Sequence, residues 1–126
     1  MVNVSEQFLE GNILLNRDLL VSWSEVINYV TPITTGVLNE EFVDAQTGIN
    51  TLLAQTQDPK IVEGSLVVPI SLISLLKDCF NTFEYQNGSL PWNLFQYTVE
   101  EIGSVYDDYS SQYYNSPPNP NGFFVY

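Results

Sequence analysis

Histidine is absent from this chain of 126 residues. The chain therefore lacks the usual general base near neutral pH, the commonest metal ligand and any Ser-His or Cys-His nucleophile pair. Neither GxGxxG nor GxxxxGK[ST] occurs, so there is no glycine-rich loop of the kind that cradles phosphate. These absences argue against most hydrolase and nucleotide-dependent mechanisms. We expect a protein that is not an enzyme, with no catalytic residues and no cofactor.

Positive charge is also scarce. The chain has 15 acidic residues and three basic ones, Arg17, Lys60 and Lys77, which gives a formal net charge of −12. Binding to nucleic acid depends on lysine and arginine to displace counterions from phosphates. The same scarcity disfavours contact with anionic lipid, whereas a cationic protein would be attracted. The charge balance thus predicts no direct nucleic-acid partner and no membrane partner.

Sulfur ligands are equally few, since Cys79 is the single cysteine. An internal disulfide is impossible, and a zinc site would need cysteine and histidine ligands that the chain does not have. No segment has the alternating Asp/Asn pattern of a calcium-binding loop. We expect no metal site, and we expect Cys79, which falls among apolar residues, to be a buried thiol.

No long hydrophobic run is present. The most apolar stretch, residues 66–76, is too short to cross a bilayer and contains Pro69. The first residues have neither a basic start nor a long apolar segment, so no secretory signal is visible. We expect the protein to be cytoplasmic at synthesis.

Apolar residues make up 44% of the chain, which is enough for one hydrophobic core. Their spacing over residues 16–30 predicts an amphipathic helix, with Asn16 as its cap and Pro32 just after its end. A second helical pattern covers residues 38–57, with Asn39 as the expected cap and Asp58-Pro59 as the stop.

Residues 60–68 are rich in β-branched side chains and are interrupted by Gly64, which predicts an extended connection or a short hairpin. A dense apolar pattern then predicts the most buried helix over residues 69–86, with Pro69 at its first position. Asn87-Gly88 is consistent with a helix cap or with a hairpin turn. We favour the cap, because a long helical pattern precedes it and Pro91 opens another that runs to about Tyr109.

These patterns predict a mainly α fold, a small four-helix domain with an extended connection near residues 60–68. The last helix is followed by Tyr113, Tyr114 and a segment with three prolines and one glycine, which cannot form a regular helix. We therefore expect a single acidic helical domain at residues 1–114 and an extended C-terminal tail, rich in proline and aromatic residues, at residues 115–126.

Paired acids on the last helix are one candidate site. Glu100 or Glu101 and Asp108 return to a similar face after two turns, with Asp107 beside them. Two such carboxylates can in principle hydrolyse a glycoside or hold Mg²⁺. No neighbouring polar constellation accompanies them, so a solvated acidic face is the favoured interpretation, and we consider it as a surface for a partner.

Aromatic residues in the tail are the second candidate site. Phe123, Phe124 and Tyr126 follow the proline-rich spacer, and large apolar groups at a chain end are costly to leave in water. They can fold back on their own domain, or they can reach a neighbouring subunit and anchor an assembly. Tyr113 and Tyr114, with Tyr106 and Tyr109, form a second aromatic group that suits an amphipathic contact surface.

Two functional hypotheses follow from these features. The first is a structural or assembly protein that acts through protein–protein contacts, as a homo-oligomer or with another protein, in a bacteriophage or other virion or in another large complex. The second is an acidic inhibitor or decoy, of the immunity, anti-restriction or anti-CRISPR type, that binds a basic protein surface. The first accounts for the aromatic tail, and the second accounts only for the charge.

Overall fold

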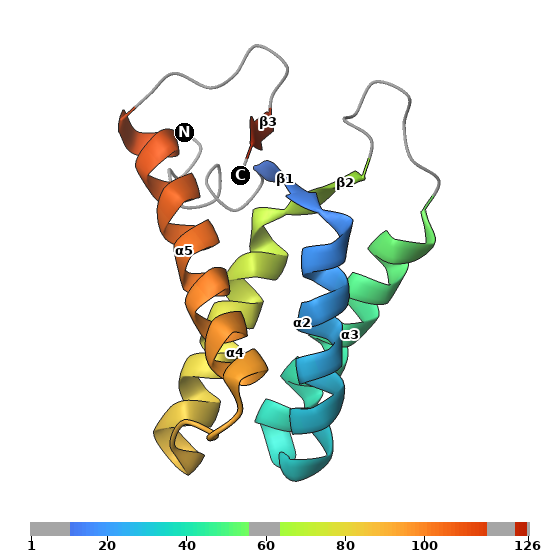
Figure 1. Ribbon diagram of the computed structural model, residues 1–126, viewed down its shortest axis with the longest axis vertical. Coiled ribbons are helices and arrows are strands. Elements are labelled where there is room, and N and C mark those ends of the chain that lie inside the picture. The colour runs from blue at the N-terminus through green and yellow to red at the C-terminus, as the bar shows by residue number, and fades with distance from the viewer. Residues whose placement is uncertain (1–10, 56–63, 116–122, 126) are drawn as a thin grey trace.

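The computed structural model describes the backbone of residues 11–55, 64–115 and 123–125, and the side chains of residues 11–55 and 64–112. Four α-helices lie side by side along the long axis, and a small sheet lies across one end (Figure 1). The mainly helical, four-helix prediction is confirmed. In chain order, the elements are β1 (Asn12–Asn16), α2 (Arg17–Val30), the 3-10 helix η1 (Thr31–Ile33), α3 (Gly36–Ala54), β2 (Ser65–Pro69), α4 (Ile70–Asn87), α5 (Asn93–Asn115) and β3 (Phe123–Val125).

The helix α2 begins where its sequence predicts. The side chain of Asn16 accepts a hydrogen bond of 2.8 Å from the backbone N–H of Asp18, which satisfies one of the free donors of the first turn. Its apolar stripe is buried, and Trp23 is fully enclosed in the core. The helix ends at Val30, and η1 contains Pro32.

The start of α3 differs from the prediction. The helix begins at Gly36, whose φ of 64° lies in the left-handed region and allows the sharp entry from η1. Asn39, the expected cap, lies inside the helix. Its amide instead donates to the carbonyl oxygens of Thr31 at 3.0 Å and Thr34 at 3.3 Å. Asn39 therefore ties α3 to the preceding turn, because η1 brings those two carbonyls within reach.

A strand that the sequence analysis did not predict, β1, organises the sheet. It pairs antiparallel with β2, so that Ile13 lies opposite Val68 and Leu15 opposite Leu66. The expected extended connection is thus a strand over residues 65–69, while residues 60–63 lie outside the described part. Pro69 is the N-terminal cap residue of α4 and not its first helical residue, so the helix begins at Ile70, one residue later than predicted.

The third strand comes from the predicted tail. Residues Phe123–Val125 form β3, which pairs parallel with β1 and places Phe123 opposite Asn12. The strand order is β2-β1-β3, with β1 in the centre. The backbone of this part of the tail therefore joins the sheet of its own chain. Residues 116–122 and Tyr126 lie outside the described part.

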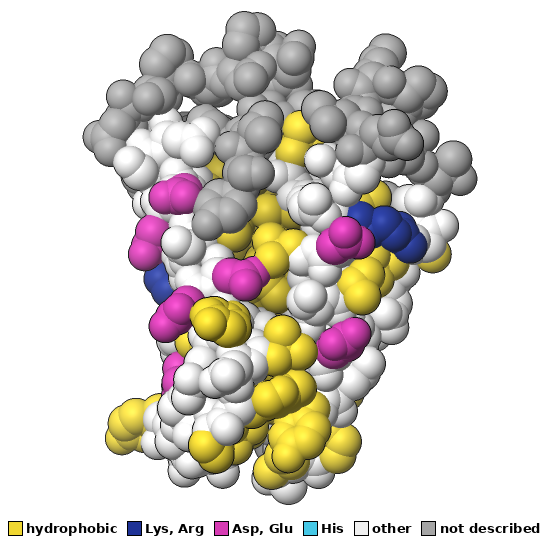
Figure 2. Space-filling model, viewed as in Figure 1, with side chains coloured by type: hydrophobic (Ala, Val, Ile, Leu, Met, Phe, Trp, Pro, Cys, Tyr) yellow, Lys and Arg dark blue, Asp and Glu magenta, His cyan; other side chains and the backbone are white. Residues whose placement is uncertain are grey.

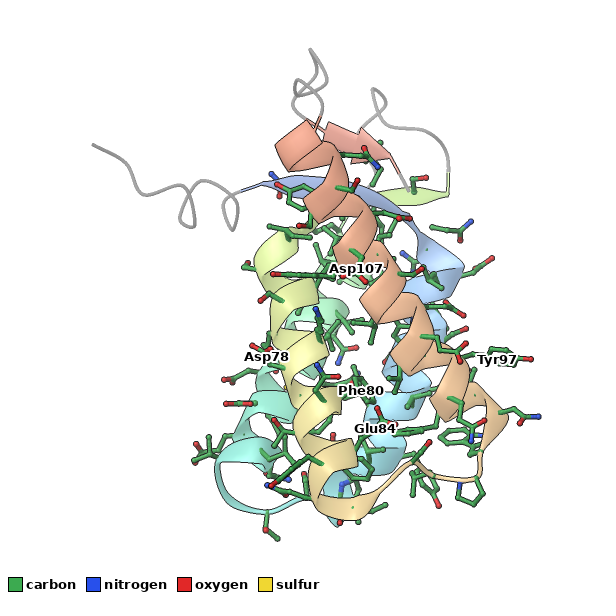
Figure 3. The ribbon with its side chains drawn as sticks, turned by 90° about the vertical axis from the view of Figure 1, so that its left-hand side faces the viewer. Asp78, Phe80, Glu84, Tyr97 and Asp107 are labelled. Atoms are coloured by element: carbon green, nitrogen blue, oxygen red, sulfur yellow. The ribbon has the colours of Figure 1, made fainter. Side chains whose placement is uncertain are left out.

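The core runs the length of the bundle and contains a group of phenylalanines from three helices. The rings of Phe42 and Phe80 are 5.2 Å apart, and those of Phe80 and Phe95 are 5.8 Å apart, both edge to face. Figure 3 shows Phe80 pointing between the helices, while Asp78 on the same helix points outward. These contacts join α3, α4 and α5 into one core.

The connection between α4 and α5 confirms the helical interpretation of Asn87-Gly88. Gly88 caps α4 with a φ of 77°, and its N–H donates to the carbonyl oxygen of Glu84 at 2.8 Å. The following helix starts at Asn93 and continues to Asn115, past the predicted end near Tyr109. Buried Val105 and Tyr109 extend its apolar stripe, so the acids at Asp107 and Asp108 do not end it.

Candidate interaction surfaces

The acidic candidate site lies along α5. Glu100, Asp107 and Asp108 are exposed, whereas Glu101 is half-buried. The two pairs are two helical turns apart, which is about 11 Å along the axis, so their carboxylates do not converge. No group of three or more His, Cys, Asp or Glu side chains within the described residues is arranged to hold a metal ion. What the structure offers here is a row of solvated carboxylates.

One of these acids has a cationic neighbour. Lys77 on α4 lies 3.9 Å from a carboxylate oxygen of Asp107, and its amine also lies 4.2 Å from the centre of the Tyr106 ring. The Asp107 side chain is 75% exposed, so water screens this ion pair and its contribution to stability is small. Through this contact the Lys77 side chain links α4 to α5, and its positive charge partly offsets the negative charge of the acids nearby.

The tyrosine group of α5 divides between core and surface. Tyr109 is only 1% exposed and belongs to the core. The expectation that it forms part of an amphipathic contact surface is therefore wrong. Tyr106 is half-buried beneath Lys77. Tyr113 and Tyr114 lie in the last turns of α5, and their side chains fall outside the described part.

In the tail, Phe123 and Phe124 lie in β3, where only the backbone is described, and Tyr126 is outside the described residues. The structure therefore brings Phe123 and Phe124 to the sheet end of the bundle, while the acids of α5 lie along its side (Figure 1). It does not gather the predicted residues into one site.

The lone cysteine lies in the core, as expected. Burial and the nearby carboxylates of Glu41 and Asp78 raise the pKa of the Cys79 thiol to about 12. The thiol donates a weak hydrogen bond, 3.8 Å from sulfur to oxygen, to the Glu41 carboxylate. Since the thiolate is the nucleophilic form, this thiol is chemically inert near neutral pH.

A surface that the sequence analysis missed lies at the end of the bundle opposite the sheet. The η1 connection and the α4–α5 connection both lie at this end, and the ring of Tyr29, at the end of α2, lies 4.9 Å from that of Trp92. Large apolar side chains on these segments remain in solvent: Ile33 is 51% exposed and Val37 is 69% exposed. Tyr85, at the end of α4, is 92% exposed.

The described segments that form this end also carry no charged side chain. Residues 26–39 and 85–99 contain no Asp, Glu, Lys or Arg, and the fold brings these two runs together. We call the surface formed by Tyr29, Ile33, Val37, Tyr85 and Trp92 the neutral end. Figure 2 shows apolar side chains both at the lower end and further up the visible face, whereas the acidic side chains visible there lie above the lower end. Glu25 and Glu40 flank the first run in the sequence, and Glu84 and Glu100 flank the second.

The two uncharged runs are visible in the sequence, so a count of charges along the chain would have found them. What the sequence does not show is that they meet. Only the antiparallel packing of α2 against α3 and of α4 against α5 places both connections at the same end of the molecule (Figure 1).

A shallow groove of about 260 Å³ lies between α2 and α3, beside the neutral end. It is lined by uncharged side chains, among them Asn28, Thr31 and Gln46. The amide nitrogen of Gln46 donates to Ser24 Oγ at 2.7 Å, while its Oε1 is buried and has no hydrogen-bond partner within the described residues. Pro32 of η1, next to Thr31, and Val43 of α3 also line the groove.

Within the described residues, no helix is both long and apolar enough to cross a membrane. Comparison with known proteins finds no family model, no curated protein and no solved structure that matches this chain.

Proposed function

We propose that this chain is a non-enzymatic assembly protein that works through protein–protein contacts, with the neutral end as its main contact surface. One observation carries the proposal. In a chain of net charge −12, exposed Ile33, Val37 and Tyr85 lie at one end of the bundle, on two runs of the chain that contain no charged residue. The cores of protein interfaces are similarly depleted of charge and rich in aromatic residues.

The energetics point the same way. Each exposed apolar group gains about 25 cal/mol for every Å² removed from water, and a partner supplies that burial at the neutral end. Single exposed apolar residues are ordinary on protein surfaces, whereas a gathered group is typical of a binding site. The folded chain buries comparable residues elsewhere, since Ile13 and Ile27 are both fully enclosed.

Photo-cross-linking in the cells that make the protein tests this proposal. A photoreactive amino acid replaces Ile33, and a matched control carries it at Val21, which is 38% exposed on α2 outside the neutral end. We expect a discrete cross-linked protein from position 33 and not from position 21. Equal labelling from both positions, or none from position 33, contradicts the proposal.

The inhibitor hypothesis has its own support, since the exposed acids Glu100, Asp107 and Asp108 form a negative row along α5. A basic partner would bind them in a salt-sensitive way. Changing Glu100 and Glu101 to Gln and Asp107 and Asp108 to Asn separates the two proposals. Loss of the position 33 cross-link in this variant favours the acidic surface, whereas its retention favours the neutral end.

A further inference from the structure

The neutral end also indicates which partner it suits, and this step rests on the proposed function. We propose that it binds the neutral end of a second copy of this chain, so that two bundles meet end to end. Two molecules that each carry a net charge of −12 repel one another, so a close contact is favoured where their acids stay apart.

Side-by-side approach is opposed by charge. Every acidic residue of the described part lies in one of the four helices, outside the two uncharged runs. Arg17 and Lys77 are the basic residues of that part, and Lys77 is already beside Asp107. Bringing the helix flanks of two copies together sets carboxylates against carboxylates, which is destabilising where water is excluded.

End-to-end approach avoids this repulsion. The uncharged turns of both copies then lie between the two sets of acids, and at physiological salt charges are screened beyond about 8 Å. A contact between two copies related by a two-fold axis uses the same patch twice, so the patch must be compatible with itself. A neutral surface of tyrosine, tryptophan, isoleucine and valine meets that requirement, and an acidic surface does not.

The salt response distinguishes this contact from binding to a basic partner. Screening the net repulsion between two copies strengthens an apolar contact, whereas it weakens an attraction between opposite charges. Self-association through the neutral end should therefore increase between about 0.01 M and about 1 M salt, as the Debye length falls from about 30 Å to about 3 Å.

Analytical ultracentrifugation of the purified full-length chain tests the proposal. We expect a reversible monomer–dimer equilibrium that salt strengthens. Val37→Asp should raise the dissociation constant at least about tenfold, because it sets two new carboxylates into the contact. Val21→Asp is the matched control: it makes the same change of residue and net charge at a valine of α2 that is 38% exposed and lies about two helical turns before Tyr29, away from the neutral end, and it should leave the dissociation constant unchanged.

Circular dichroism of both variants shows whether they fold. A wild-type chain that stays monomeric at every concentration and salt overturns the proposal, as does a dimer that Val21→Asp disrupts and Val37→Asp does not. A monomeric chain whose position 33 still cross-links to a different protein in cells rejects self-association and retains the assembly function. If the chain neither dimerises nor cross-links from position 33, both self-association and the assembly function are rejected.

Discussion

The two ends of the bundle carry similar apolar side chains but differ in how far these side chains are buried. At the sheet end, Ile13 and Val68 lie on paired strands and are fully enclosed. At the neutral end, Ile33 and Val37 belong to a short turn and the first turn of a helix, and more than half of each side chain is in solvent. Burial thus depends on whether a covering element is present, and among the described residues such an element, the sheet, lies at one end of the bundle.

Paired alanine substitutions test this difference most strongly. Ile13→Ala should lower the free energy of unfolding by about 2–5 kcal/mol, because it leaves a cavity under the sheet. Ile33→Ala should change it by no more than about 0.5 kcal/mol, since little burial is lost. Urea denaturation of the two variants provides the measurement. Comparable losses would mean that Ile33 is covered in the solution monomer, and the contrast between the ends would disappear.

Deleting residues 123–126 sharpens the comparison by uncovering one side of the sheet end. The edge of β1 then loses its parallel partner, and each backbone hydrogen bond lost costs about 0.5–1.5 kcal/mol net. We expect a total loss of about 1–3 kcal/mol in unfolding, together with faster hydrogen exchange at β1. An unchanged stability would show that β3 does not pair with β1 in solution.

The same deletion separates the tail from the neutral end as a contact surface. Self-association should remain after deletion, because the neutral end lies at the far end of the bundle. If association is instead abolished, the tail links two copies, as the aromatic residues of the tail suggested in the sequence.

A smaller effect concerns the monomer with Val37→Asp. Position 37 lies in the first turn of α3, where the helix dipole favours a negative charge. We expect the substitution to stabilise the monomer by about 0.3–1 kcal/mol in dilute thermal unfolding while it weakens association. A destabilised monomer would indicate that folding itself requires an uncharged residue there, and neutrality would then carry no information about binding.

The helices could be predicted because their signals are local. The stripe through Trp23 and the cap at Asn16 follow from spacing within a few residues, and both are confirmed. The capping role of Asn39 was wrong, because its true partners Thr31 and Thr34 are brought close only by η1. Strand β1 was missed for a similar reason: its short apolar run becomes a strand through pairing with residues far along the chain.

The candidate site was harder to predict than the fold. Sequence reasoning selected groups of like residues, the acids of α5 and the aromatics of the tail, and the structure places them apart. The neutral end depends on two connections meeting in space, which no local pattern reveals. Tyr29 and Trp92 are distant in sequence and touch only because α2 and α5 pack against one another.

The central place of β1 has a practical consequence for work with this protein. Strands from early and late in the chain, β1 and β3, lie side by side, with Asn12 opposite Phe123. A fluorescent label or fusion domain joined near either strand is therefore attached at the sheet end, away from Ile33 and Val37. In an end-to-end pair, two such labels would sit at the outer extremities of a rod, and the separation between them would report its length.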